Sequence, residues 1–237
     1  MINLDVFNST TNYEIYLVNE GADAQNFWCF LQKPQGVPTS GVYANSSAML
    51  SVLPNYQGTN SFTIPLQYKL GAGASNNAVG LDVKIDSSII KDVSLEQLWE
   101  AKYANVPPNQ GPQMNIVQGE NSPAGTIGFM SNDFNKVNNE DNGWFSNMSF
   151  GIESSSGFMG LTWSPSPNVT NTITPKFAFY IATGSYTSNS LADITTISNT
   201  SAKVELSDFE NLEATVTLTA SGNWIITPGK PKSVALV

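Results

Sequence analysis

The side chains with the clearest ligand chemistry lie between residues 133 and 144 of this 237-residue chain. Three carboxylates, those of Asp133, Glu140 and Asp141, are interspersed with asparagines, and Trp144 follows directly. Carboxylate and amide oxygens bind hard cations and accept hydrogen bonds from sugar hydroxyls, and an indole face stacks on flat ligands. We therefore predict a ligand-binding site formed by Asp133, Glu140, Asp141, Asn142 and Trp144.

An ordinary solvated turn between strands is the alternative for the same segment. The run Asp-Asn-Gly at 141–143 is typical of residues that adopt left-handed backbone conformations in turns. The spacing does not match an EF-hand calcium loop, because Val137 stands where a ligand is required and Trp144 stands where the closing Glu is required. The prediction is therefore a binding loop for a small molecule or glycan, with no metal site assigned.

Missing residue types exclude several kinds of catalytic site. The chain has no histidine, one cysteine and ten basic residues, all of them lysine. Ser-His-Asp and Cys-His catalysis, histidine-based metal sites and thiolate metal sites therefore have no residues to form them. Glycoside hydrolysis by two carboxylates remains chemically open, but no pair stands out in the sequence. We predict no catalytic residues and no cofactor.

The net charge of -9 argues against a nucleic-acid partner. Binding to phosphates requires a positive surface, and arginine is the usual residue that reads guanine. Cys29, the single cysteine, lies in the apolar run 27–31. Free cysteine is among the most buried residue types, so we expect a buried, slowly reacting thiol.

Hydrophobic residues alternate with polar ones along most of the chain, which predicts strands. Many short strands separated by turn residues indicate an all-β protein of antiparallel β-sandwich type. A helix is predicted only over 94–102, where Ser94 and Gln97 have capping-box spacing and Leu98 lies on an apolar stripe. The predicted strands are 13–18, 26–32, 48–53, 62–70, 79–85, 125–131, 144–153, 157–164, 175–183, 193–197, 202–206, 213–220 and 224–227.

Three stretches are predicted to be loops: 71–77, the Pro/Gln/Gly-rich segment 104–124, and 131–143. We expect one domain over residues 1–237. The alternative is two sub-lobes, 1–104 and 125–237, that are joined by the long loop 104–124. No apolar stretch approaches the ~20 residues of a membrane-spanning helix. The N-terminus lacks the basic and apolar regions of a signal peptide, so we expect a cytoplasmic or leaderless-secreted protein.

Several strand patterns resemble those of the RhiA-like proteins, which are quorum-regulated proteins of plant-associated bacteria. The similar segments are NMSFGI at 147–152, GFMGLTWSPSP at 157–167, FAFYIATGSY at 177–186, TVTLTASGNW at 215–224 and NFWCFLQKP at 26–34. The resemblance implies a leaderless microbial protein under population-density control. It implies no reaction and no site residues.

These observations favour a non-enzymatic binding or interaction protein of the RhiA-like type. The alternative is a pore-forming or lectin-like effector, because the Ser/Thr-rich stretch 170–174 before an apolar strand is also typical of inserting hairpins. A carboxylate-based glycosidase is the one enzyme class that the composition leaves open.

Overall fold

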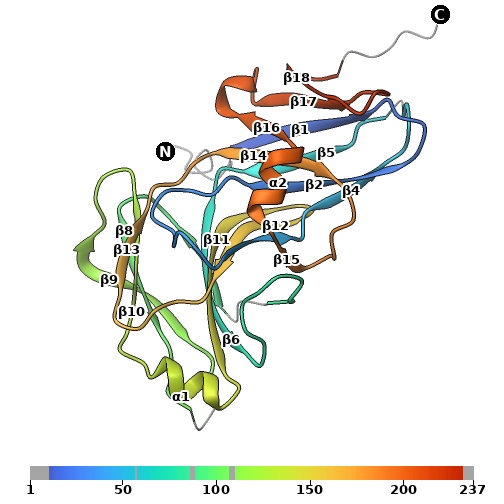
Figure 1. The fold of residues 1–237 in the computed structure, drawn as a ribbon. Coiled ribbons are helices and arrows are strands. Elements are labelled where there is room, and N and C mark those ends of the chain that lie inside the picture. Colours follow the sequence, from blue (N-terminus) through green and yellow to red (C-terminus); the bar gives the residue numbers. More distant parts are fainter. Residues whose placement is uncertain (1–10, 57, 86–88, 107–109, 232–237) are drawn as a thin grey trace, which may run out of the picture.

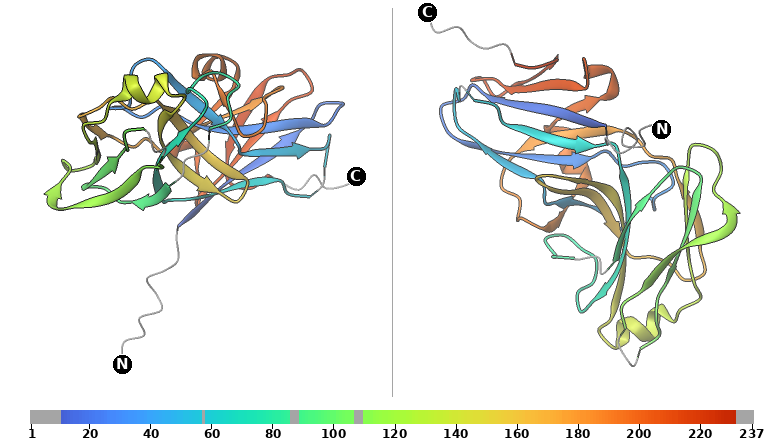
Figure 2. Two further views of the ribbon diagram at one scale, coloured as in Figure 1. Left: turned by 90° about the horizontal axis from the view of Figure 1, so that it is seen from below. Right: turned by 180° about the vertical axis from the view of Figure 1, so that it is seen from behind.

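The computed structural model describes residues 11–56, 58–85, 89–106 and 110–231. The chain is mostly β, with 51% strand and 7% helix, and its four sheets are largely antiparallel and not closed. Figure 1 shows the sheets as stacked layers, with the sheet that contains β1 at one end of the molecule and the sheet that contains β8 at the other. The views in Figure 2 show the same arrangement. The all-β prediction is therefore confirmed.

Two four-stranded sheets form the upper layers of Figure 1. The first contains, in spatial order, β18 (Trp224–Pro228), β17 (Glu213–Leu218), β1 (Asn12–Asn19) and β5 (Ser61–Pro65). The second contains β16 (Ala202–Glu205), β14 (Ala178–Thr183), β2 (Gln25–Leu31) and β4 (Met49–Val52). All of their pairings are antiparallel except that of β1 with β17.

A six-stranded sheet lies between these layers and the last sheet. It contains, in spatial order, β15 (Ser190–Ala192), β3 (Val42–Ser46), β12 (Gly157–Trp163), β11 (Phe145–Ser154), β6 (Tyr68–Ser75) and β7 (Ile89–Val93). The last sheet contains β13 (Thr170–Ile173), β10 (Ile127–Ser131), β8 (Gln97–Lys102) and β9 (Gln113–Asn121). Each of the four sheets combines strands that precede residue 104 with strands that follow residue 112.

Strand β11 shows how the sequence pattern builds the core. Met148, Phe150 and Ile152 point to one face and are fully buried there. Alternate residues of a strand point to opposite faces, so Ser149 and Glu153 lie on the other face. The buried face joins an apolar core to which all four sheets contribute, with fully buried members such as Ile15, Phe27, Phe150 and Ile127.

The helix predicted over 94–102 is wrong, because most of this segment is strand β8. Ser94 and Gln97 do interact, but in a turn: the Ser94 amide donates to the Gln97 side chain at 2.9 Å, and Glu96 between them has φ +68°. Strand β8 pairs with β10 on one side and β9 on the other. Its backbone is thus satisfied by a sheet, and this tertiary pairing overrides local helix propensity.

The structure also corrects the prediction of at most one short helix. The described residues contain two α-helices: α1 (Lys136–Asp141), inside the predicted loop 131–143, and α2 (Ile194–Thr200), where a strand was predicted over 193–197. A 3-10 helix, η2 (Leu206–Asp208), follows β16. Asp193 caps α2 by accepting a hydrogen bond from the Thr195 amide at 2.8 Å, which is the role that Asp prefers at helix starts.

Three further predictions fail where turn residues were misread. The predicted strand 79–85 is a turn around Asp82, whose φ is +58°. The predicted loop 71–77 belongs largely to β6, and the predicted loop 104–124 contains the nine-residue strand β9. Pro65 divides the predicted strand 62–70 into β5 and β6, and β5 lies at a sheet edge as expected for a strand with proline.

Candidate functional site

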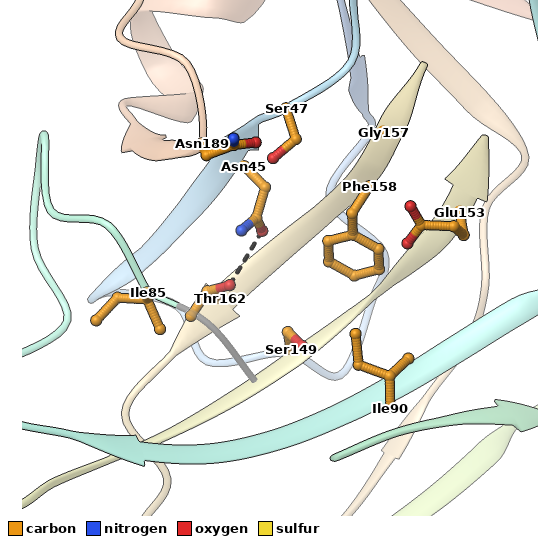
Figure 3. Close-up of a pocket in the computed structure, with 10 residues that line it drawn as sticks. All are labelled: Asn45, Ser47, Ile85, Ile90, Ser149, Glu153, Gly157, Phe158, Thr162 and Asn189. Carbon is orange, nitrogen blue, oxygen red and sulfur yellow. Dashed lines mark hydrogen bonds between the residues drawn. The ribbon is translucent and has the colours of Figure 1, made fainter. Parts of the chain in front are cut away.

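The face of the six-stranded sheet opposite to the core carries a pocket with a volume of about 240 Å³ (Figure 3). Strands β3, β7, β11 and β12 supply most of its lining, and three connecting segments complete it. The residues that line the pocket are Asn45, Ser47, Ile85, Ile90, Ser149, Glu153, Gly157, Phe158, Thr162 and Asn189.

The antiparallel register of β11 and β12 places the central pocket residues side by side. Ser149 is paired with Thr162, Gly151 with Gly160, and Glu153 with Phe158. Residues that are directly opposite on antiparallel strands share a face of the sheet, with Cβ atoms ~5 Å apart. A row of polar, small and aromatic side chains therefore crosses two strands and forms the base of the pocket.

Two glycines allow the Phe158 ring to lie against the sheet. A Cβ atom added at Gly160 would come within 2.3 Å of the Phe158 Cε1 atom, and one added at Gly151 would come within 2.8 Å of the Phe158 Cζ atom. Only residues without a side chain fit beneath the ring. Glycine inside a strand often marks such a close approach. In Figure 3 the ring lies among the other residues of the pocket.

Polar side chains surround this ring. The Thr162 hydroxyl donates a hydrogen bond to Asn45 Oδ1 at 3.0 Å, and both residues are buried. This bond orients the Asn45 amide at one side of the pocket, and Figure 3 shows Ser47 and Asn189 near it. The arrangement presents hydroxyl and amide groups around an aromatic face.

Glu153 is the one carboxylate among the described residues that line the pocket. Partial burial raises the pKa of its carboxyl group, and the nearby positive charge of Lys69 opposes this rise to a smaller extent. The Lys69 Nζ atom is itself 2.7 Å from Asp92 Oδ1 on β7. Lys69 is therefore shared between two carboxylates, which leaves Glu153 incompletely neutralised.

The residues predicted as a binding site lie elsewhere, around α1. Asp133 is exposed and lines an open depression of about 630 Å³, together with residues of the first turn of α1. Glu140, Asp141, Asn142 and Trp144 do not line this depression. Asp133 therefore lines this depression without the other four predicted residues, and the ligand-binding role of the group stays a prediction.

Hydrogen bonds within the polypeptide engage several polar groups of this segment. The Asn135 side chain caps α1 by accepting from the Asn138 amide at 3.0 Å, and Asn142 ends the helix. Lys136 lies 3.8 Å from Glu140, one helical turn along α1. Trp144 is half-buried. Much of the asparagine content thus serves a short helix and its ends.

The Phe158 pocket was not predicted, although one signal for it was present. Gly151 and Gly160 lie inside strands that the alternation pattern identifies, and a glycine in a strand interior contributes no packing of its own. Their pairing across the two strands becomes visible only when the register is known.

Within the described part of the chain, no three acidic or cysteine side chains lie close enough together to hold a metal ion. The described helices are also too short or too polar to cross a membrane. No protein-family model, no curated protein and no solved structure matches this chain.

Proposed function

We propose that the protein is a non-enzymatic, lectin-like binding protein that holds a carbohydrate in the Phe158 pocket. The observation that carries this proposal is the Phe158 ring, which lies over two facing glycines and is surrounded by hydroxyl, amide and carboxylate groups. A sugar ring has an apolar face that packs on an aromatic ring and a rim of hydroxyl groups that require hydrogen-bond partners. The pocket supplies both kinds of surface at one place.

The dimensions of the pocket favour a compact ligand. Its volume of about 240 Å³ lies below the roughly 300–1,000 Å³ of typical small-molecule sites. We therefore expect it to take one sugar unit, with any further units extending into solvent. The strands that carry the lining are fixed by the sheet, so the ring and the polar groups are held in place before the ligand binds.

Binding without hydrolysis fits the acidic residues of this site better than catalysis does. Hydrolysis by the usual route needs a second carboxylate roughly 5–9.5 Å from the first. Among the described lining residues Glu153 has no such partner, and the nearby Asp92 is held by Lys69 at 2.7 Å. Membership of the RhiA-like family remains part of the proposal and rests on the strand patterns given above.

A glycan panel measured by isothermal titration calorimetry tests the proposal. We expect at least one glycan to bind and the Phe158→Leu variant to lose most of the affinity, because leucine keeps apolar contact with the glycines but lacks the flat ring. Tyr56→Ala is the matched control, since Tyr56 is 54% exposed and lies outside the pocket. Equal affinity of Phe158→Leu and the parent would overturn the proposal.

Two further experiments test a binding site at α1 and glycosidase activity as alternatives. The double variant Trp144→Phe, Asp141→Asn should bind as the parent does, and a loss of binding there would place the site at α1. Product analysis after prolonged incubation with the bound glycan should show no cleavage. Cleavage that depends on Glu153 would identify the protein as a glycosidase.

A further inference from the structure

Among the described residues that line the Phe158 pocket, the charge lies on one side only. In Figure 3 the Phe158 ring lies between Glu153 on one side and Asn45 and Thr162 on the other. The described lining residues include one acidic residue, Glu153, and no basic residue. An entering ligand therefore meets a negative charge at one end of the ring and neutral polar groups at the other.

The surroundings of Glu153 leave its negative charge only partly compensated. The positive charge that acts on Glu153 is that of Lys69 on β6, and Asp92 on β7 already lies 2.7 Å from the Lys69 ammonium group. Two carboxylates thus share one ammonium group, and the three side chains together carry one net negative charge. A partly buried carboxylate is stabilised by a proton or by a second cation.

The Phe158 ring offers the second contact that a cation needs. A positive charge within ~6 Å of an aromatic ring centre is attracted to the negative face of the ring. Glu153 and Phe158 are directly opposite each other on β11 and β12, so one small ammonium group is able to approach both. The pairing of an aromatic face with an adjacent carboxylate favours positively charged groups over neutral ones.

We propose that the pocket selects ligands that carry a protonated amine, an amino sugar above all, with Glu153 as the counter-charge and the Phe158 ring as the face on which the ligand packs. This inference rests on the proposed carbohydrate-binding function and names its ligand class. Asn45, Thr162 and Asn189 then bind the hydroxyl groups at the far end of the sugar. Acidic sugars are excluded, because their carboxylates would face Glu153.

Binding of such a ligand depends on pH in a defined direction. A proton on Glu153 removes the counter-charge and so competes with the cationic ligand. While the ligand amine stays protonated, affinity is complete above the pKa of Glu153 and is lost as the pH falls through it, and burial places this pKa above its ordinary value. The charged groups on the neighbouring strands are Lys69 on β6 and Asp92 on β7, whose side chains form an ion pair at 2.7 Å.

The test compares two matched probes by titration calorimetry at low salt, at a pH above the pKa of Glu153 and below that of the ligand amine: a trisaccharide of glucosamine and the same trisaccharide in N-acetylated form. We expect the amine form to bind about tenfold more tightly, which is the effect of one favourable cation contact of ~1.4 kcal/mol. Glu153→Gln should reduce the preference to about twofold or less, because the variant keeps the side-chain shape and removes its charge.

The outcomes separate the inference from the function on which it rests. Equal binding of the two probes, or a preference that survives in Glu153→Gln, overturns the cation selectivity and leaves the carbohydrate-binding function standing. Absence of binding to both probes and to every member of the neutral glycan panel overturns both. A preference for the amine form that disappears in Glu153→Gln and weakens with added salt supports the inference.

Discussion

The packing of Phe158 over glycine predicts a specific coupling between two substitutions. In Gly160→Ala the new methyl group would lie 2.3 Å from Phe158 Cε1 and 2.5 Å from Cζ, and 2.8 Å from the backbone oxygen of Phe150. Ordinary contacts between such atoms are about 3.5 Å or longer, so the ring must move away by roughly 1 Å. Overpacking of this kind destabilises by about 1–3 kcal/mol.

Removing the ring should relieve most of this strain. Phe158→Ala alone should lower the free energy of unfolding by about 1–2 kcal/mol, because the ring is half-buried. In the double variant the methyl group no longer meets a ring, and alanine favours a strand over glycine by about 0.5–1 kcal/mol. We therefore expect the double variant to be more stable than the sum of the single effects predicts, by about 1 kcal/mol.

Urea unfolding of the parent, the two single variants and the double variant measures this coupling. The free energies are comparable when all four unfolding transitions have the same slope. Gly151→Ala is the matched control, because the two atoms nearest to its methyl group would be backbone atoms, Met159 O at 2.4 Å and Gly160 Cα at 2.6 Å. Its destabilisation should persist largely unchanged in the Phe158→Ala background. The position assigned to the ring would be refuted if the destabilisation of the double variant equalled the sum of the Gly160→Ala and Phe158→Ala destabilisations to within about 0.4 kcal/mol.

Three further predictions follow from buried groups and a helix cap. Cys29 is fully buried, and burial raises the pKa of its thiol. A thiol reagent should therefore label Cys29 slowly in native buffer and fast in denaturant, and fast labelling in native buffer would contradict this prediction. Burial raises the pKa of Tyr68 to about 12 and also raises that of Tyr103, both ordinarily 10. The stability that these two neutral tyrosines contribute is complete below pH 10 and should fall as the pH rises towards 12. In Tyr68→Phe the thermal unfolding temperature should fall less steeply over this pH range. Asp193→Ala removes the cap of α2 and should lower the free energy of urea unfolding by about 1 kcal/mol, whereas no change would argue against the helix.

Alternation of apolar and polar residues predicted the strands best where one face enters the core. Strands β1, β2, β11, β12 and β17 lie within a few residues of their predicted positions, because burial on one side imposes a period of two. The predicted strands 213–220 and 224–227 also form, as β17 and β18, and the turn between these antiparallel strands has Gly222 at φ +81°. These features depend on local sequence alone.

Local sequence failed where a distant partner decides the conformation. Strand β8 has the composition of a helix, yet it is the neighbour of both β9 and β10 in a sheet. Strand β9 is mostly exposed and polar, so no apolar pattern distinguishes it from a loop, and pairing with β8 holds it as a strand. A single sequence does not reveal which backbone groups will be paired across such distances.

The pocket illustrates the same limit at the level of function. The segment 133–144 attracted attention because its polar residues are consecutive, whereas the pocket collects residues from positions as distant as Asn45 and Asn189. Each of these is an ordinary residue in its own strand or turn. The pocket forms because Gly151 and Gly160 are paired, which leaves room for the Phe158 ring close to the sheet. A pair of facing glycines on the outer face of a sheet, beside an aromatic residue, is therefore the feature to seek when strand register is known.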